Sequence, residues 1–200
     1  MRRVKLLLVG AAACASAARA QSPSATSAPP ITAADVHFFT GMIAHHSQAV
    51  LMAGWAVSHG AGPGVAGLCA RIEVGQRDEI VTMQNWLRDH GQSVPVPDTT
   101  RGAMNMPMDH MTMMPGMLTA AQLRQLDAAR GTAFDSLFLT YMISHHQGAL
   151  IMVNDLLGSE GAAQDGLEYK IATDISADQT VEIDRMRRML AAMSPGGSSQ

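Results

Sequence analysis

Two pairs of adjacent histidines, each preceded by a methionine, are the residues of this sequence whose types and spacing could do chemistry. They are Met42, His45 and His46 early in the chain, and Met142, His145 and His146 further along. Residues three or four apart lie on neighbouring turns of one helical face, so on a helix each thioether would lie beside an imidazole. Cu(I) accepts thioether sulfur and neutral imidazole nitrogen, whereas zinc and iron sites more often add thiolate or carboxylate. The pattern therefore predicts a soft-metal site with these residues as candidate ligands.

The segment around each histidine pair is repeated at a constant shift of 100 residues. The recurring residues are Phe38, Thr40, Met42, Ile43, His45, His46, Ala49 and Met52, which match Phe138, Thr140, Met142, Ile143, His145, His146, Ala149 and Met152. A single histidine on a helix is usually a satisfied core or surface residue, but adjacent histidines repeated together with methionine favour metal ligation. Met52 and Met152 lie on the same predicted face and join the candidate ligands.

Each copy also begins with the same helix-start signal. Thr32 and Asp35 in the first copy match Thr132 and Asp135 in the second. In a Thr-x-x-Asp sequence the hydroxyl accepts an orphan backbone amide, and the carboxylate favours the positive end of the helix. We therefore expect Thr32 and Thr132 both to cap a helix.

A second pair of segments agrees at a shift of 103 residues. The matching residues are Ile72, Gln76, Glu79, Ile80, Met83 and Leu87 in the first half, and Ile175, Gln179, Glu182, Ile183, Met186 and Leu190 in the second. We expect the isoleucines and leucines in the core, and the glutamines and glutamates on solvated faces. Met83 and Met186 are candidate ligands because the repeat matches them, although a methionine on a helix is more often core filler.

The two repeats together predict an all-α fold in which each half is a helical hairpin. The expected helices span about 33–59, 64–90, 133–157 and 162–193, with glycine-rich breaks between them. Hairpins over 32–91 and 132–193 would pack as a four-helix bundle covering residues 32–193. Such a bundle can be filled by aliphatic side chains and methionine, so the few aromatic residues suffice.

The connector between the hairpins, residues 92–131, contains a methionine-rich stretch. Its candidate ligands are Met104, Met106, Met108, His110, Met111, Met113, Met114 and Met117. Two prolines and a glycine exclude a helix there, so the methionines have no helical face to fill, and we interpret the stretch as a metal-capturing loop. The alternative is a loop folded over an apolar patch with methionine as adaptable filler. Thr119 with Gln122 then predicts a short capped helix that leads to a break at Gly131.

The ends of the chain indicate export. Residues 1–20 combine a basic start, a short apolar run and a small-x-small site ending at Ala20, which predicts a cleaved signal peptide and a periplasmic or secreted protein. Cleavage before Cys14, giving a lipoprotein, is the alternative. Residues 21–31 and 194–200 are rich in Ser, Pro and Gly and predict a disordered linker and tail. No later stretch has the ~20 consecutive apolar residues that a membrane span needs.

The net charge, the cysteine content and the remaining histidines limit the classes of function further. Beyond the predicted signal the chain carries 10 basic and 17 acidic residues, a net charge of −7, which argues against nucleic-acid binding. Cys69 would be the single cysteine of the mature chain, so a disulfide framework is excluded and we expect a small buried residue. His37, His59 and His90 have no match in the repeat and are weak metal candidates.

The sequence resembles a known family in the segments FFTGMIAHHSQAVLMA and FLTYMISHHQGALIMV, each followed by a Gln-x-x-Glu-Ile-x-x-Met segment. They are similar to the two halves of domain of unknown function 305 (DUF305), which includes the CopM-like periplasmic copper-binding proteins. The resemblance covers about residues 32–193. It implies a ferritin-like four-helix fold and copper binding outside the cytoplasm. Carried over position by position, it points to Met42, His45, His46, Met52, Met142, His145, His146 and Met152.

Three classes of function follow from these observations. The first, which we predict, is an exported, non-enzymatic copper-binding protein that sequesters or hands on copper, mainly Cu(I), in copper resistance or homeostasis. Its partners would be copper ions and another periplasmic copper protein or exporter. The second is a structural or partner-binding bundle that requires no metal. The third is a ferritin-like metalloenzyme, which the chain disfavours because it contains no Glu-x-x-His motif.

Overall fold

The computed structural model describes residues 30–96 and 114–193, and within these ranges all regular structure is helical. The helices are α1 (Ala33–Gly54), α2 (Pro63–Asp89), α4 (Ala120–Ala128), α5 (Gly131–Gly158) and α6 (Gly166–Met193). The predicted signal peptide, the linker as far as residue 29, the C-terminal tail and residues 97–113 of the connector lie outside the described residues. None of the described helices is long and apolar enough to cross a membrane.

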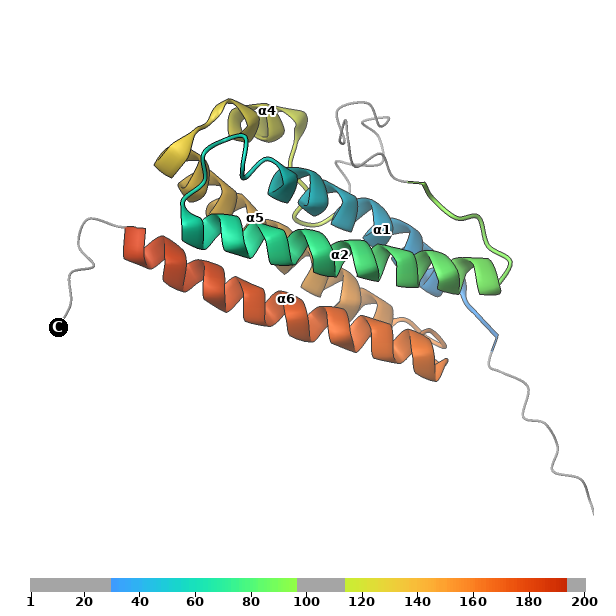
Figure 1. Cartoon of the computed structure of the whole chain (residues 1–200). Helices are drawn as coiled ribbons and strands as arrows, with labels where there is room; N and C mark the ends of the chain where they lie inside the picture. The colour runs from blue at the N-terminus through green and yellow to red at the C-terminus, as the bar shows by residue number, and fades with distance from the viewer. Residues whose placement is uncertain (1–29, 97–113, 194–200) are drawn as a thin grey trace, which may run out of the picture.

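The four long helices form two antiparallel hairpins that pack side by side (Figure 1). In the first hairpin α1 packs against α2, and in the second α5 packs against α6. The hairpins meet mainly along α1 and α5, while α2 and α6 lie next to each other on the other side of the bundle. The predicted all-α bundle of two hairpins is thereby confirmed.

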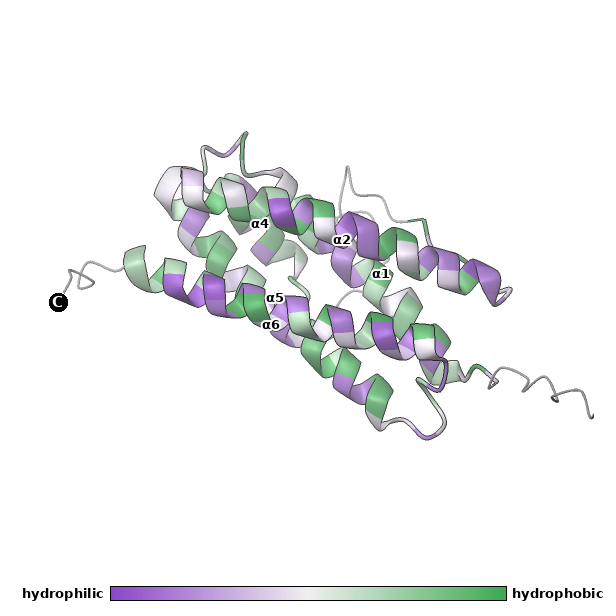
Figure 2. Cartoon of the chain, turned by 60° about the horizontal axis from the view of Figure 1, so that its bottom comes forward, coloured by the Kyte–Doolittle hydropathy of each residue, from purple (hydrophilic) through white to green (hydrophobic). Residues whose placement is uncertain are grey.

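Charge distribution explains which helices are central. In α1 the one charged residue is Asp35, and most of the helix is buried. In contrast, α2 and α6 alternate charged and apolar side chains, and Figure 2 shows this alternation along both helices. An amphipathic helix packs its apolar face inward and leaves the charged face in water. The helices with few charged residues, α1 and α5, therefore form the interior pair, and α2 and α6 form an outer pair.

The core is divided into two apolar clusters that the repeat relates to each other. The first is built around Phe38, Phe39 and Trp86, and the ring of Phe39 stacks on Trp86 with centroids 4.0 Å apart. The second is built around Phe134 and Phe138. Burying each such aromatic side chain stabilises the fold by about 1.5–3 kcal/mol. The predicted core positions in the repeat of 103 residues are buried, apart from Leu190, which is only partly buried.

Helix starts differ between the two halves. Thr32 caps α1 as predicted, with the Asp35 amide donating to its hydroxyl and the Asp35 carboxylate accepting from the Thr32 amide at 2.6 Å. The expected cap at Thr132 is wrong, because α5 begins at Gly131 and its N-cap, Arg130, makes no side-chain cap. The capping box at Thr119 with Gln122 is present and starts α4.

Asp35 and its repeat partner Asp135 each accept a hydrogen bond from a loop of the opposite hairpin. The amide of Ala163, before α6, donates to Asp35 Oδ1 at 3.0 Å. The amide of Gly62, the N-cap of α2, donates to Asp135 Oδ2 at 3.1 Å. Asp35 makes its contact while it also caps its own helix, whereas α5 has no side-chain cap. These two contacts join the hairpins at opposite ends of the bundle.

Two helix bounds also differ from the prediction because of local turns. The first helix ends at Gly54 rather than near residue 59, since residues 55–60 turn back before α2. The last helix begins at Gly166 rather than near residue 162, because Ala163 adopts a positive φ of 54° while its amide reaches Asp35. Loop contacts to the other hairpin, which local sequence does not encode, set both bounds.

Candidate metal centre

His45 and His145 stack on each other at the interface between α1 and α5. Their ring centroids are 3.8 Å apart and the rings are tilted by 36°. Both side chains are buried. The two central helices therefore meet through histidines that the repeat places at equivalent positions.

His46 and His146 complete a group of four neighbouring imidazoles, which we call the histidine row. The centroid of His46 lies 6.4 Å from that of His45, and the centroid of His146 lies 6.3 Å from that of His145. Both outer rings are fully buried. The repeat thus brings all four predicted histidines into one place in the fold.

A glutamate from each outer helix fixes the end of the row. The Nε2 of His46 lies 2.7 Å from Glu79 Oε2 on α2, and the Nε2 of His146 lies 2.6 Å from Glu182 Oε2 on α6. A carboxylate accepts the hydrogen bond, so Nε2 carries the proton and Nδ1 carries the lone pair in the neutral ring. Within the described residues, Nδ1 of both rings is buried without a hydrogen-bond partner. A carboxylate that orients a histidine in this way is the usual second-sphere partner of a metal-binding imidazole.

Sequence reasoning missed these glutamates. Glu79 and Glu182 were expected on solvated faces, but they are only 22% exposed and bind the histidines. Gln76 and Gln179 were also expected in solvent, and both are buried. The signal that could have found them is their recurrence at the shift of 103 residues, because solvent-facing residues have no packing reason to recur.

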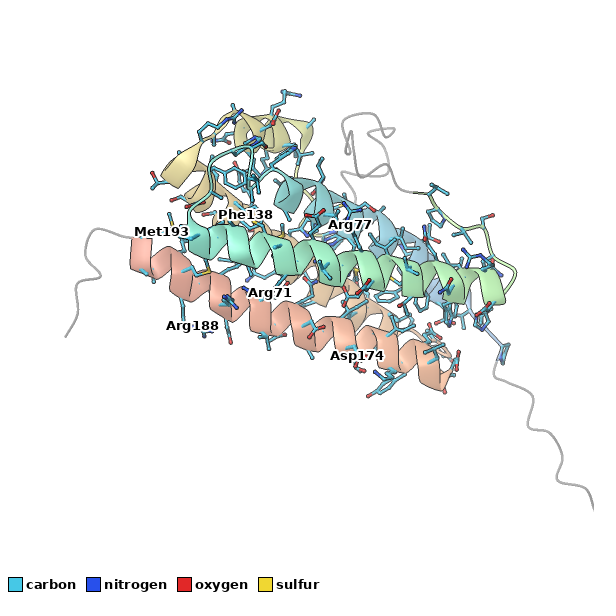
Figure 3. All side chains as sticks on the ribbon, in the orientation of Figure 1. Arg71, Arg77, Phe138, Asp174, Arg188 and Met193 are labelled. Carbon is cyan, nitrogen blue, oxygen red and sulfur yellow. The ribbon has the colours of Figure 1, made fainter. Side chains whose placement is uncertain are left out.

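The two glutamates line one groove between α2 and α6, with a volume of about 310 Å³. Gln76 and Gln179 also line it, and within the described part of the chain the Gln76 amide is buried without a partner. Burial, together with Glu79 and Glu182, raises the pKa of Asp178 on the same groove. Arg71 lies at this groove (Figure 3). Carboxylates thus lie between solvent and the outer rings of the histidine row.

The end of the connector covers the opposite side of the row. The Nε2–H of His45 donates to the carbonyl oxygen of Pro115 at 3.1 Å. The Gln48 side chain makes two hydrogen bonds to the backbone of Leu118. Its oxygen accepts from the Leu118 amide at 2.7 Å, and its nitrogen donates to the Leu118 carbonyl at 3.1 Å. Gly148 makes room for the segment, because a Cβ there would lie 1.9 Å from the Pro115 oxygen. We call residues 114–118 the connector anchor.

The helical methionine candidates fall into two equivalent groups. Met42, Met83 and Met152 belong to the first apolar cluster, and Met52, Met142 and Met186 belong to the second. Each group takes its members from three different helices, and all six side chains are buried. The repeat thus places three thioethers in each half of the bundle, in clusters that share the helices of the histidine row.

The structure describes two of the connector candidates, Met114 and Met117. Met114 is half-buried and packs against the first cluster, as the apolar-filler alternative expects, and Met117 is also half-buried. The candidates Met104, Met106, Met108, His110, Met111 and Met113 lie outside the described residues. Among residues 30–96 and 114–193, no group of three or more His, Cys, Asp and Glu side chains is arranged to hold a metal ion.

Burial favours the neutral form of His45, His145 and His146 by lowering the pKa of each ring. Burial and the neighbouring His46 lower the pKa of His45 to about 3. Burial and His45 lower the pKa of His145 well below its ordinary value. Burial also lowers the pKa of His146, although its bond to Glu182 acts in the opposite direction. Neutral imidazole is the form that binds metal, so little deprotonation would be needed for ligation at neutral pH.

Among the described residues, His37, His59, His90 and Cys69 are not part of the row. His59 is buried and its Nε2 lies 2.9 Å from the carbonyl of Asp127, while His90 Nδ1 lies 2.8 Å from the carbonyl of Trp86. His37 is exposed on α1. Cys69 is buried as expected, and burial raises its pKa to about 12.

Comparisons with known proteins give one family and several structures. A family model described as domain of unknown function (DUF305) matches residues 35–190. The structure of a DUF305 fragment from Deinococcus radiodurans matches with a TM-score of 0.70 and 28% identity, covering 82% of this chain and 100% of that one. A putative secreted DUF305 protein from Streptomyces coelicolor matches with a TM-score of 0.66 and 28% identity, covering 79% and 92%.

Structures of CopM are also similar to this chain. Its Cu(II)-bound form gives a TM-score of 0.62 at 27% identity, covering 80% of this chain and 97% of that one. Its Cu(I)-bound form gives 0.58 at 27% identity, covering 78% and 94%. A silver-bound form of CopM matches as well. No curated protein matches the chain.

Proposed function

Because this chain belongs to the DUF305 family, we propose that it is an exported copper-binding protein that holds copper, mainly as Cu(I), through methionine and histidine side chains. It sequesters the ion or hands it on in copper resistance or homeostasis, and it is not an enzyme. CopM, whose structures include copper-bound and silver-bound forms, supports the choice of metal.

The histidine row is the single observation that carries this proposal. A buried polar atom without a hydrogen-bond partner costs free energy, of the order of 1–3 kcal/mol. Both nitrogens of His145, and Nδ1 of His46 and of His146, are such atoms in the part of the chain that the structure describes. A metal ion at the row would use the Nδ1 lone pairs of His46 and His146 and the one lone pair of the neutral His145 ring, whose other nitrogen carries a proton. A ligand that the polypeptide itself does not contain would thus account for three of these four nitrogens.

Sulfur makes copper a better candidate than zinc or iron. The glutamates at the ends of the row already accept the Nε2 protons, so they fit the role of orienting residues rather than direct ligands. Additional donors would come from the two methionine groups, and thioether sulfur favours Cu(I) over harder ions. Met42, His45, His46 and Met52 in the first half, with Met142, His145, His146 and Met152 in the second, are the ligands we assign first, and Met83 and Met186 complete the two groups.

An exported location fits the same chemistry. Outside the cytoplasm a cluster of thiols tends to oxidise to disulfides, whereas thioethers have no proton to lose. The predicted signal peptide over residues 1–20 would place the chain there. Another periplasmic copper protein or an exporter would then receive the ion by stepwise ligand exchange. The methionines of residues 104–117 would catch it first.

A Cu(I) titration against a chromophoric chelator tests the assignment. In the double variant His46→Gln/His146→Gln, each amide nitrogen can replace Nε2 at its glutamate while the Nδ1 lone pair is lost. We expect this variant to lose at least about tenfold in Cu(I) affinity. His90→Gln, outside the row, serves as the matched control. A chain lacking residues 104–113, which retains the connector anchor, should keep the bundle site and bind fewer ions. Equal affinity and capacity in all four proteins would overturn the proposal and favour a bundle without a required metal.

A further inference from the structure

A pocket at the surface of the first half contains a soft-donor set away from the histidine row. Its volume is about 280 Å³, and it lies between α1, α5 and the connector anchor. His37, Met114 and Met152 line it with imidazole and thioether groups. The other lining residues are Ala34, Phe38, Pro115, Asp155, Leu156 and Ser159.

The two thioether side chains of this pocket meet over Gly41. A Cβ at Gly41 would lie 3.3 Å from Met114 Sδ and 3.3 Å from Met152 Cε. Both side chains therefore occupy the space that a glycine leaves open on α1. The matching position in the second half is Tyr141, whose hydroxyl donates to Gln125 Oε1 at 2.6 Å. The arrangement is thus specific to the first half.

Exposure decreases step by step from this pocket to the interior. His37 is exposed and Met114 is half-buried. Met152 is 9% exposed, whereas its repeat partner Met52 is fully covered. Met152 belongs to the same apolar cluster as Met42, and Met114 packs against that cluster. Met152 therefore connects a solvent-accessible pocket with buried thioethers.

We propose that His37, Met114 and Met152 form a surface Cu(I) site through which the ion passes to the buried methionines of the first half. The inference rests on the proposed function, because it assigns the entry point of the same copper-binding bundle. Two thioethers and one imidazole suit a soft ion of low coordination number. Transfer inward exchanges one thioether for another with Met152 bound throughout, so neither electrons nor protons need to move.

Methionine methyl NMR with Ag(I) as the probe tests this inference. The full mature chain is labelled with ¹³C at the methionine methyl groups, and Met114→Leu and Met152→Leu identify the two resonances. We expect both resonances to shift in the first steps of the titration, before those of Met42 and Met83. Shifts confined to the buried methionines would overturn the surface site and leave the proposed function standing. No shift of any methionine would overturn both.

Kinetics with matched variants adds a second readout. Cu(I) transfer from a chromophoric donor should slow at least about tenfold in Met114→Leu, the size of effect that losing even an outer-sphere partner produces. Met189→Leu, on α6 and only partly buried, should transfer at the wild-type rate. Gly41→Ala should also slow transfer, because the new Cβ crowds both thioethers. Circular dichroism verifies that each variant is folded. Equal rates in Met114→Leu and Met189→Leu would contradict the inference.

Discussion

The carbonyl oxygen of Pro115 accepts a hydrogen bond from Nε2 of His45 at 3.1 Å. This bond joins the end of the methionine-rich connector directly to the stacked histidine pair. It also leaves Nδ1 as the ring nitrogen of His45 with the lone pair in the neutral form. The connector is therefore part of the histidine environment, and changes that displace it should be felt at the candidate metal centre.

Gly148→Ala should displace the connector anchor. The added Cβ would lie 1.9 Å from the Pro115 oxygen, a distance that forces the backbone to move. We expect the free energy of unfolding to fall by about 1–3 kcal/mol, as overpacking generally produces. Urea denaturation measures the change. Gly67→Ala, in α2 with no atom close to its Cβ position among the described residues, should instead gain up to about 1 kcal/mol from helix propensity. Equal effects at the two glycines would contradict the tight packing at Gly148.

Replacing the glutamates that orient the outer histidines should weaken copper binding without unfolding the protein. Glu79→Gln/Glu182→Gln keeps the size of both side chains but removes the negative charge that supports the Nε2 protons. We expect Cu(I) affinity to fall by about 10–100-fold, measured by chelator competition. Glu73→Gln, a surface change next to Arg77, is the control. Unchanged Cu(I) affinity in the double variant would show that these glutamates do not support metal binding.

Conservative changes at Met83 and Met186 distinguish a ligand from core filler. Leucine has a similar volume, so Met83→Leu/Met186→Leu should cost less than about 1.5 kcal/mol in stability. If the thioethers bind copper, the number of Cu(I) ions bound or their affinity should decrease, because leucine supplies no donor. Met189→Leu, on the same helix as Met186 but only partly buried, is the control. A double variant that titrates like Met189→Leu would assign both residues to the core alone.

The pair of carboxyl groups Asp35 and Glu168 should make stability depend on pH. Burial, followed by the hydrogen bond to Asp35, raises the pKa of Glu168 from 4.5 to about 8. Hydrogen bonds from Glu168 and from two backbone amides lower the pKa of Asp35, although burial alone would raise it. Glu168 is thus protonated in the folded state at neutral pH and donates to the Asp35 carboxylate.

Because the folded pKa of Glu168 exceeds the unfolded value, its contribution is fully present below pH 4.5 and is lost as the pH rises through about 8. The lowered pKa of Asp35 acts in more acidic solution, below its ordinary value of 3.8. Urea denaturation from pH 5 to 9 should show wild type losing stability relative to Glu168→Gln by up to a few kcal/mol. Parallel pH profiles for the two proteins would rule out the shared proton.

Most of the fold and the histidines of the site could be predicted from the sequence repeat. Recurrence of His45 at His145 and of Ile72 at Ile175 is enough to predict equivalent helices and a shared interior. The glutamates were misassigned because a carboxylate on an amphipathic helix usually faces water. Whether Glu79 is a surface residue or a histidine partner depends on the packing of α2 over α1, which periodicity within one helix does not reveal.

The contacts of the connector could not be predicted from the repeat, for a different reason. Gln48 and Gly148 occupy equivalent positions but have opposite roles, since one holds the connector anchor and the other makes room for it. A pattern that matches residue by residue predicts equivalent surroundings and misses such differences. His37 was rated a weak candidate for the same reason, because its match in the second half is Leu137.

The single connector packs against one side of the two repeated hairpins, so equivalent positions of the repeat have different surroundings. Met152 is 9% exposed and Met52 is fully covered, although the two occupy equivalent positions in the repeat. A strictly symmetric bundle would present an arriving ion with two equivalent entry sites. In this bundle the more accessible methionine of the pair, Met152, belongs to the first apolar cluster, so the proposed entry site and the methionines behind it lie on the same side of the molecule.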